Sequence, residues 1–140
     1  MTRDELTNIT TRWIVEGWQR GLAEMVDELH AESFVDHSAA GRPVNREGFK
    51  SGIREMYKAF PDFHAEIAEL VIDTEQSKVA VRWLATGTHR DVFMGIPATG
   101  RTIAFTGIEI IRIQHGLIIE RWGEWNGDEL IRQLSQVATA

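Results

Sequence analysis

The spacing of apolar residues changes once along the chain, near Pro61, and this change constrains the fold more than any other feature. Before Pro61, apolar residues recur every three to five positions, which is typical of amphipathic helices. From Phe63 onward they recur about every second position, which is typical of strands. Helices followed by a run of strands predict an α+β fold with helices on one face of an antiparallel sheet. The order does not match a doubly wound nucleotide-binding fold, whose strands alternate with helices.

Local signals place the expected helices. They are predicted over residues 4–18, 22–29, 45–60 and 127–137, the last with Leu130, Ile131, Leu134 and Val137 as its apolar side. Thr2 and Glu5 have the spacing of a capping box, and Asn45 can cap the third helix. Pro61 disfavours a helical conformation at Phe60, so the third helix should end there.

Four long strands are expected at 63–73, 78–90, 101–114 and 117–126, after a short extended piece at 33–38. Their length for a chain of this size indicates a strongly curved sheet. Short connections at 75–77 and 114–116 predict antiparallel neighbours. The connection 91–100 contains Val-Phe-Met-Gly-Ile-Pro, which is apolar for a loop, so it should cover either the entrance of a pocket or a subunit interface.

Composition excludes several classes of function. The 140 residues fit one domain, 1–140, and a net charge of −6 without any Lys/Arg run argues against nucleic-acid binding. The absence of cysteine excludes disulfides and thiolate metal sites. No 18-residue apolar stretch and no basic-then-apolar leader are present, so we expect no membrane association and a cytoplasmic location. The histidines lack the spacing of metal ligands, and no metal is expected.

The last hairpin sorts residues into two faces if its turn centres on His115 and Gly116. A two-residue loop then places Glu109 opposite Trp122. Residues that face each other share one side of the sheet. This register predicts an inner face that carries Phe105, Gly107, Glu109, Ile111, Glu120, Trp122, Glu124 and Asn126. It predicts an outer face that carries Thr106, Ile108, Ile110, Arg112, Ile119, Arg121 and Trp125.

Both predicted faces are substantially apolar, although the helices can cover only one of them. An exposed apolar face of this size indicates an interaction surface. We therefore expect a homodimer through the outer face of the sheet. The alternative is that a terminal segment of the same chain covers this face.

A series of short motifs between about residue 30 and residue 135 resembles the SnoaL-like polyketide cyclases and related ester cyclases of the NTF2-like superfamily. The motifs, in order, are Asp36-His37, Gly48-Phe49, Phe60-Pro61-Asp62, Arg82, Gly87-Thr88-His89, Phe93, Gly95, Thr99-Gly100-Arg101, Gly107-Ile108-Glu109, Arg112-Ile113, Gly116, Glu120, Trp122 and Gln133-Leu134. No single motif is specific for this family, but the order and spacing of the motifs together are. The resemblance implies a cone of helices and curved sheet, usually dimeric, with an internal pocket and no metal or organic cofactor.

The resemblance also implies an acidic residue in the pocket that acts as general acid and base in an intramolecular aldol closure. In the family this aspartate follows the tryptophan motif by four residues. Counted from Trp122, that position holds Asn126 in this chain. An amide cannot take up a proton at neutral pH, so Glu124 is predicted to act in its place and Asn126 to donate a hydrogen bond.

Two histidines complete the predicted catalytic set of Glu124, Asn126, His89 and His37. An unperturbed histidine titrates near neutrality and can move protons, but either one could instead anchor a loop. The predicted substrate-binding residues are Arg82, Glu109, Trp122, Phe105, Tyr57 and Phe60. Arg82 needs an anionic partner if it is buried, and Glu109 or Glu124 could serve. Trp83 and Trp125 are expected on the outer face.

Two kinds of function fit these features. The first is a cyclase-type enzyme with cofactor-independent acid/base chemistry on a small hydrophobic ester or ketone. The second is a non-catalytic module that holds a small hydrophobic ligand in the same cone. The position of Asn126 favours the second more than the family resemblance alone would. A purely structural dimer with a filled cone is a third possibility.

Overall fold

The computed structural model describes residues 1–135. Its helices are α1 (Arg3–Arg12), η1 (Trp13–Gln19), α2 (Met25–Leu29), α3 (Arg46–Ala59) and α4 (Gly127–Ser135). Its strands are β1 (His30–Asp36), β2 (His64–Asp73), β3 (Lys78–Thr88), β4 (Thr102–Gln114) and β5 (Leu117–Trp125). The predicted elements are thereby confirmed, with ends shifted by a few residues. Val137, predicted in the last helix, lies outside the described residues.

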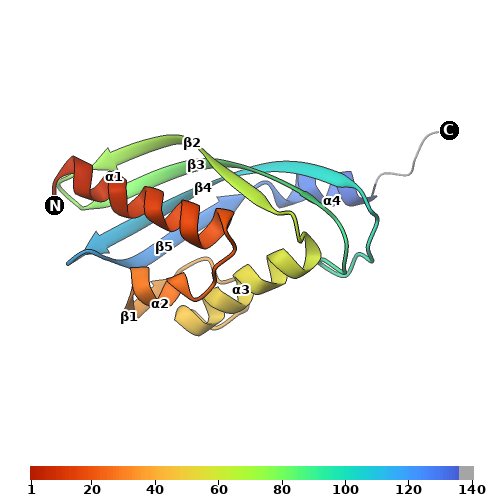
Figure 1. Ribbon diagram of the computed structural model, residues 1–140, viewed down its shortest axis with the longest axis horizontal. Coiled ribbons are helices and arrows are strands. Elements are labelled where there is room, and N and C mark those ends of the chain that lie inside the picture. The colour runs from red at the N-terminus through yellow and green to blue at the C-terminus, as the bar shows by residue number, and fades with distance from the viewer. Residues whose placement is uncertain (136–140) are drawn as a thin grey trace.

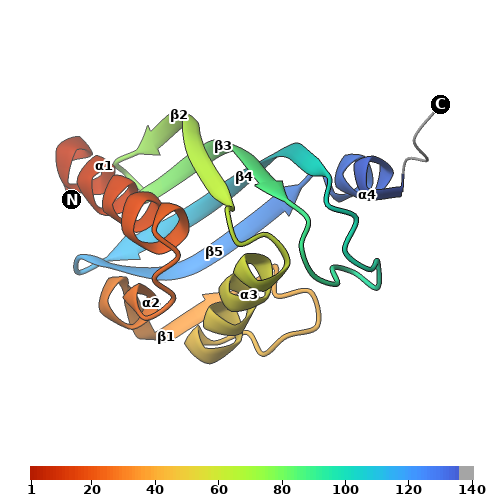
Figure 2. The same ribbon diagram turned by 45° about the vertical axis from the view of Figure 1, so that its right-hand side comes forward.

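The five strands form one curved sheet in the order β1-β5-β4-β3-β2. Figures 1 and 2 show α1, α2 and α3 on one side of this sheet, whereas α4 lies at the end farthest from the N-terminus. The pairs from β2 to β5 are antiparallel, as predicted. The expectation of a purely antiparallel sheet is wrong at one edge, because β1 pairs with β5 in parallel. No helix in the described part of the chain is long and apolar enough to cross a membrane.

The N-terminal helix begins as predicted but changes its winding half-way. The Thr2 side chain accepts a hydrogen bond from the Glu5 backbone N–H, 3.1 Å away. From Trp13 the helix continues as a seven-residue π-helix, which is rare at this length. Gly17 makes room for the Trp13 indole ring, since a Cβ at position 17 would lie 2.2 Å from that ring. The π-helical turn thereby carries Ile14 and Trp18 toward the sheet.

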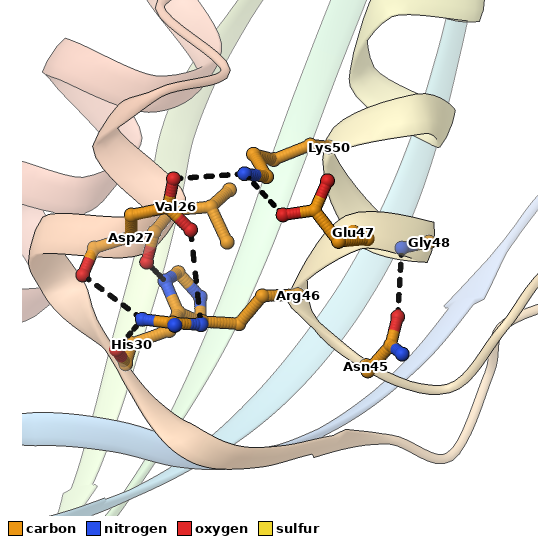
Figure 3. Close-up of polar contacts among 8 residues, drawn as sticks. All are labelled: Val26, Asp27, His30, Asn45, Arg46, Glu47, Gly48 and Lys50. Carbon is orange, nitrogen blue, oxygen red and sulfur yellow. Dashed lines mark hydrogen bonds and ion pairs between the residues drawn. The ribbon is translucent and has the colours of Figure 1, made fainter.

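Polar contacts join the start of α3 to α2, as Figure 3 shows. Asn45 caps α3 by accepting from the Gly48 N–H at 3.0 Å, and the helix ends one residue before Phe60, both as predicted. Lys50 binds the Asp27 carboxylate at 2.8 Å, and Arg46 donates to the Asp27 carbonyl oxygen. Among other effects, the hydrogen bond from Lys50 lowers the pKa of Asp27. These contacts hold α2 and α3 together.

The register of the β4–β5 hairpin differs from the prediction after its first two pairs. Ile113 pairs with Ile118 and Gln114 with Leu117, as a two-residue turn requires. The register then shifts by one residue, so that Arg112 faces Glu120. Ile119 is therefore an extra residue, a β-bulge, and a one-residue shift turns every later side chain to the other face. The face assignments for β5 from Glu120 onward are wrong for this reason, whereas those for β4 hold.

His30 is a titratable residue inside the aromatic core. It is 1% exposed, lies 4.5 Å from the Trp13 ring centroid, and its Nδ1 lies 3.2 Å from the Val26 carbonyl oxygen. Removal from water lowers the pKa of His30 from 6.5 to about 3. The imidazole is therefore neutral in the folded protein at ordinary pH, and it packs as an aromatic ring.

The burial of His30 predicts a loss of stability in mild acid. Between pH 6.5 and pH 3 the unfolded chain binds a proton at His30 that the folded chain does not, so protonation favours unfolding. We expect protonation of His30 in the unfolded chain to lower the free energy of unfolding by about 2 kcal/mol between pH 7 and pH 5. Urea unfolding of wild type and His30→Phe at both pH values measures the effect. An equal pH dependence in the two proteins would contradict the assignment.

Candidate functional site

A cavity of about 640 Å³ lies between the helices and the sheet. Its lining is mainly apolar and aromatic, and it includes Ile14, Trp18, Phe49, Trp83, Phe105 and Trp125. Val92, Phe93 and Met94 from the loop after β3 also line it, so the apolar segment of that loop borders the pocket. A cavity of this size with a few polar groups is typical of a small-molecule site.

The polar end of the pocket is built around Arg121. Its Nη1 lies 2.9 Å from Asp36 Oδ1, and its Nε lies 2.9 Å from Glu109 Oε2. Asp36 and Glu109 are 1% and 3% exposed. Burial by itself would lower the pKa of Arg121, but the carboxylates of Glu109 and Asp36 hold it above its usual value. One guanidinium thus bridges two buried carboxylates.

Neighbouring strands bring these three residues together. Asp36, the last residue of β1, pairs with Arg121 of β5, and Glu109 of β4 pairs with Gly123. Gly123 leaves room for the guanidinium, since a Cβ there would lie 2.2 Å from Arg121 Nη2. The guanidinium also lies over the Phe49 ring, 4.9 Å from its centroid, which adds a cation–π contact. The arrangement fixes Arg121 from three sides.

Each of the two carboxylates has one oxygen without a hydrogen-bond partner in the described residues. Asp36 Oδ2 and Glu109 Oε1 are buried and have no hydrogen-bond partner in the described residues. Glu109 lines the pocket, whereas Asp36 does not. An ionised carboxylate only accepts hydrogen bonds, so Glu109 Oε1 can receive a proton or a donor group from a ligand. Glu109 is therefore the carboxylate best placed to act on a molecule in the pocket.

Glu124 and Trp122 do not face the pocket, and their predicted location there is wrong. The bulge at Ile119 places them opposite Ile108 and Ile110 on the outer face. Trp83 and Trp125, expected on the outer face, line the pocket instead. Arg121, also expected outside, points inward for the same reason.

Asn126 caps a helix and does not line the pocket. Its side-chain oxygen accepts from the Glu129 N–H at 3.2 Å, at the start of α4. It also borders a smaller outer groove of about 310 Å³, together with Arg82 and Glu124. Arg82 lies there because it pairs with Ile108 on the outer face of β4. Its ion-pair partner is Glu69 on β2, 3.4 Å away, and both side chains are about half exposed. Neither Glu109 nor Glu124 pairs with Arg82, contrary to expectation.

His89 anchors the loop that borders the pocket. Its ring is fully buried, and its Nδ1 accepts a hydrogen bond from the Thr99 backbone N–H at 3.2 Å. The Thr99 hydroxyl oxygen also lies 3.0 Å from Nδ1. The Nε2 atom has no partner among residues 1–135. Of the two alternatives for His89, proton transfer or anchoring a loop, these contacts fit the second.

His37 belongs to an ionic cluster on the outer side of the sheet. Its Nε2 lies 2.7 Å from Glu120, whose other oxygen accepts from Arg112, and its ring stacks on Trp122 at 4.8 Å. Hydrogen bonds from His37 and Arg112 lower the pKa of Glu120. The cluster contains no residue of the pocket lining.

The remaining predicted binding residues are partly placed as expected. Phe105 lines the pocket. Phe60 is fully buried beside His89 and Phe93 in the core, behind the lining. Tyr57 donates a hydrogen bond to the Trp18 carbonyl oxygen in the π-helix, and burial raises the pKa of Tyr57 to about 12.

The prediction missed three residues of the site: Asp36, Arg121, and Arg42, which lines the pocket from the loop before α3. Asp36 was visible only as part of a motif with His37. Arg121 was assigned to the wrong face, and no local signal marks the bulge that turns it inward. Across residues 1–135, no group of three or more His, Cys, Asp or Glu side chains lies together as metal ligands would.

Comparisons with known proteins agree with this architecture. The family model described as SnoaL-like polyketide cyclase matches residues 8–134. The chain is 29% identical to a provisionally assigned polyketide cyclase from Bacillus cereus, with a TM-score of 0.81 over 99% of this chain and 87% of that one. It is 28% identical to IdmH from Streptomyces antibioticus, also provisionally assigned as a polyketide cyclase, with a TM-score of 0.80 over 94% and 99%.

TsrD from Streptomyces laurentii has the same fold at 22% identity, with a TM-score of 0.86 over 98% of this chain and 99% of that one. A search of curated proteins found no match. The helices, the curved mixed sheet and the C-terminal helix are those of the NTF2-like fold.

Proposed function

Since this chain belongs to the SnoaL-like polyketide cyclase family, we propose that it catalyses a cyclase-type acid/base reaction on a small hydrophobic ketone or ester. The proposal rests on the surroundings of Glu109, a buried carboxylate beside an apolar pocket. Its Oε2 is bound by Arg121, and its Oε1 has no hydrogen-bond partner in the described residues. Glu109 replaces Glu124 in this role, because Glu124 lies on the outer face.

In the proposed reaction, Glu109 Oε1 removes a proton from the carbon next to a carbonyl group of the substrate. The resulting enolate carbon attacks a second carbonyl carbon of the same molecule, so that a carbon–carbon bond forms and that carbonyl oxygen becomes an alkoxide. The proton held by Glu109 returns to the alkoxide. Neither step needs a metal or an organic cofactor. The pocket contributes by holding the two reacting carbons near each other.

The supporting residues act through Glu109. Arg121 holds the carboxylate in one orientation, and Asp36 holds Arg121. Asp36 itself is fixed by the Ser38 backbone N–H, 2.9 Å from its Oδ1. We propose Asp36 and Arg121 as positioning residues, because the free oxygen of Glu109 is the group that would meet the substrate.

Proton removal can be tested without knowing the natural substrate. The probe is 2-acetonaphthone, an apolar ketone whose methyl protons exchange for deuterium when a base forms the enolate. We expect wild-type protein in D₂O to accelerate this exchange, followed by proton NMR. A ketone that binds by equilibrium dialysis but exchanges no faster than in buffer would favour the second function, a ligand-binding module without catalysis.

We also propose a homodimer in which a second copy covers the outer face of the sheet. Apolar side chains lie exposed there on three neighbouring strands: Val71 (61% exposed), Leu84 (43%), Ile108 (49%) and Ile110 (38%). The corrected register adds Trp122 to this face beside Ile110. Burying such a face against its own copy is the common route to a symmetric dimer.

The dimer predicts a specific effect of charge on the outer face. Ile108→Lys should convert a dimer into a monomer, because it would place two like charges near each other in the interface. Sedimentation velocity at micromolar concentration measures the mass of the particle. Val44→Lys is the control, since Val44 is equally exposed but lies in the loop before α3. A monomeric wild type, or a dimeric Ile108→Lys, would contradict the proposal.

A further inference from the structure

Arg42 lines the same pocket from the loop between β1 and α3, and the proposed mechanism does not use it. Its Nε atom is buried and has no hydrogen-bond partner within the described residues. A buried guanidinium N–H without an acceptor is unfavourable, because folding takes it from water and returns no partner. An acceptor oxygen on a bound molecule would satisfy it.

The helix behind Arg42 is shaped to hold its guanidinium. A Cβ at Gly52, in the middle of α3, would lie 2.7 Å from Arg42 Cζ and 2.8 Å from Nε. Glycine is less favourable than alanine inside a helix, so helix formation does not explain its presence there. The missing side chain allows the guanidinium to lie against the helix, at the wall of the pocket.

Among the described residues that line the pocket, Arg42 is the cation without a carboxylate partner. Arg121 already binds the carboxylates of Asp36 and Glu109. Lys58 also borders the pocket, but its side chain is 77% exposed and lies 4.0 Å from Asp91. A solvated ammonium group contributes less to binding than a guanidinium held in an apolar wall.

We infer that Arg42 binds a carbonyl or carboxylate oxygen of the substrate, whose remaining body is an apolar ring system held by the aromatic lining. This inference rests on the proposed function, since it places the substrate in the same pocket, and it names the substrate class more closely. A charged donor strengthens its hydrogen bond as negative charge develops on the oxygen, so the same contact would stabilise an enolate.

Three probes with one ring system test the inference by equilibrium dialysis. They are 2-naphthoate, methyl 2-naphthoate and 2-ethylnaphthalene, which carry an anionic oxygen, a neutral carbonyl oxygen and no oxygen. We expect wild type to bind at least one oxygen-bearing probe about 10-fold more tightly than the hydrocarbon. Preference for naphthoate alone would identify a carboxylate ligand, and preference for both would identify a carbonyl ligand.

Substitutions then locate the effect at Arg42. Arg42→Leu keeps apolar contact but removes the donors, so it should abolish the 10-fold preference and leave hydrocarbon binding within about twofold. Gly52→Ala keeps the charge but displaces the guanidinium, and it should reduce the preference in the same direction. Lys58→Leu is the matched control and should leave all three affinities within about twofold. Circular dichroism confirms that each variant is folded.

Two results would overturn the inference: no preference of wild type for an oxygen-bearing probe, or a preference that persists in Arg42→Leu. Either result would leave the role of Glu109 open, because ketone exchange measures proton removal and not probe affinity. Conversely, failed exchange with an intact, Arg42-dependent preference would remove the catalytic proposal and keep the binding site.

Discussion

Glu109→Gln is expected to lower the rate of ketone deuterium exchange by about 100-fold or more, the usual contribution of a positioned general base. Glutamine has nearly the same shape and can still accept from Arg121, but its amide cannot take up a proton at neutral pH. The folded structure and the affinity for 2-acetonaphthone should therefore change little. The initial exchange rate at saturating ketone, measured by NMR, isolates the chemical step from binding.

Glu124→Gln is the matched control for this experiment. It makes the same chemical change 15 positions further along the chain, on the exposed outer face of β5. We expect its exchange rate to equal that of wild type. Loss of exchange in Glu124→Gln with full activity in Glu109→Gln would show that the acid/base group lies on the outer face, contrary to our proposal.

Arg121→Met should destabilise the protein by about 3–5 kcal/mol, because it leaves two buried carboxylates without their cation. Urea unfolding of wild type and Arg121→Met at pH 7 measures the loss of stability.

Arg82→Met is the control for Arg121→Met. It removes an arginine from the neighbouring sheet surface, where its partner Glu69 is also exposed to water. Exposed ion pairs contribute little, so we expect the free energy of unfolding to change by less than about 1 kcal/mol. An Arg121→Met deficit as small as that of Arg82→Met would mean that the buried cluster does not need its cation.

On β5, the difference between the predicted and observed faces traces to one residue. Counting from the turn at His115 gives the correct first pairs of the hairpin, but the bulge at Ile119 reverses all later faces of β5. The prediction therefore put Trp122 and Glu124 in the pocket and Arg121 outside it. Glu109 and Phe105 kept their predicted face because β4 has no bulge and pairs regularly with β3.

The sequence by itself determined the elements of this protein, because their signals are local. Thr2 and Asn45 cap helices through neighbours three residues away, and Pro61 ends α3 through its own ring. The tertiary structure alone decided how Asp36 and Arg121 join the site. Asp36 contacts Arg121, 85 positions further along the chain, because β1 and β5 pair in parallel. The bulge in β5 turns the Arg121 side chain inward, where it also contacts Glu109. Pairing register depends on the packing of the whole sheet, which no short stretch of sequence encodes.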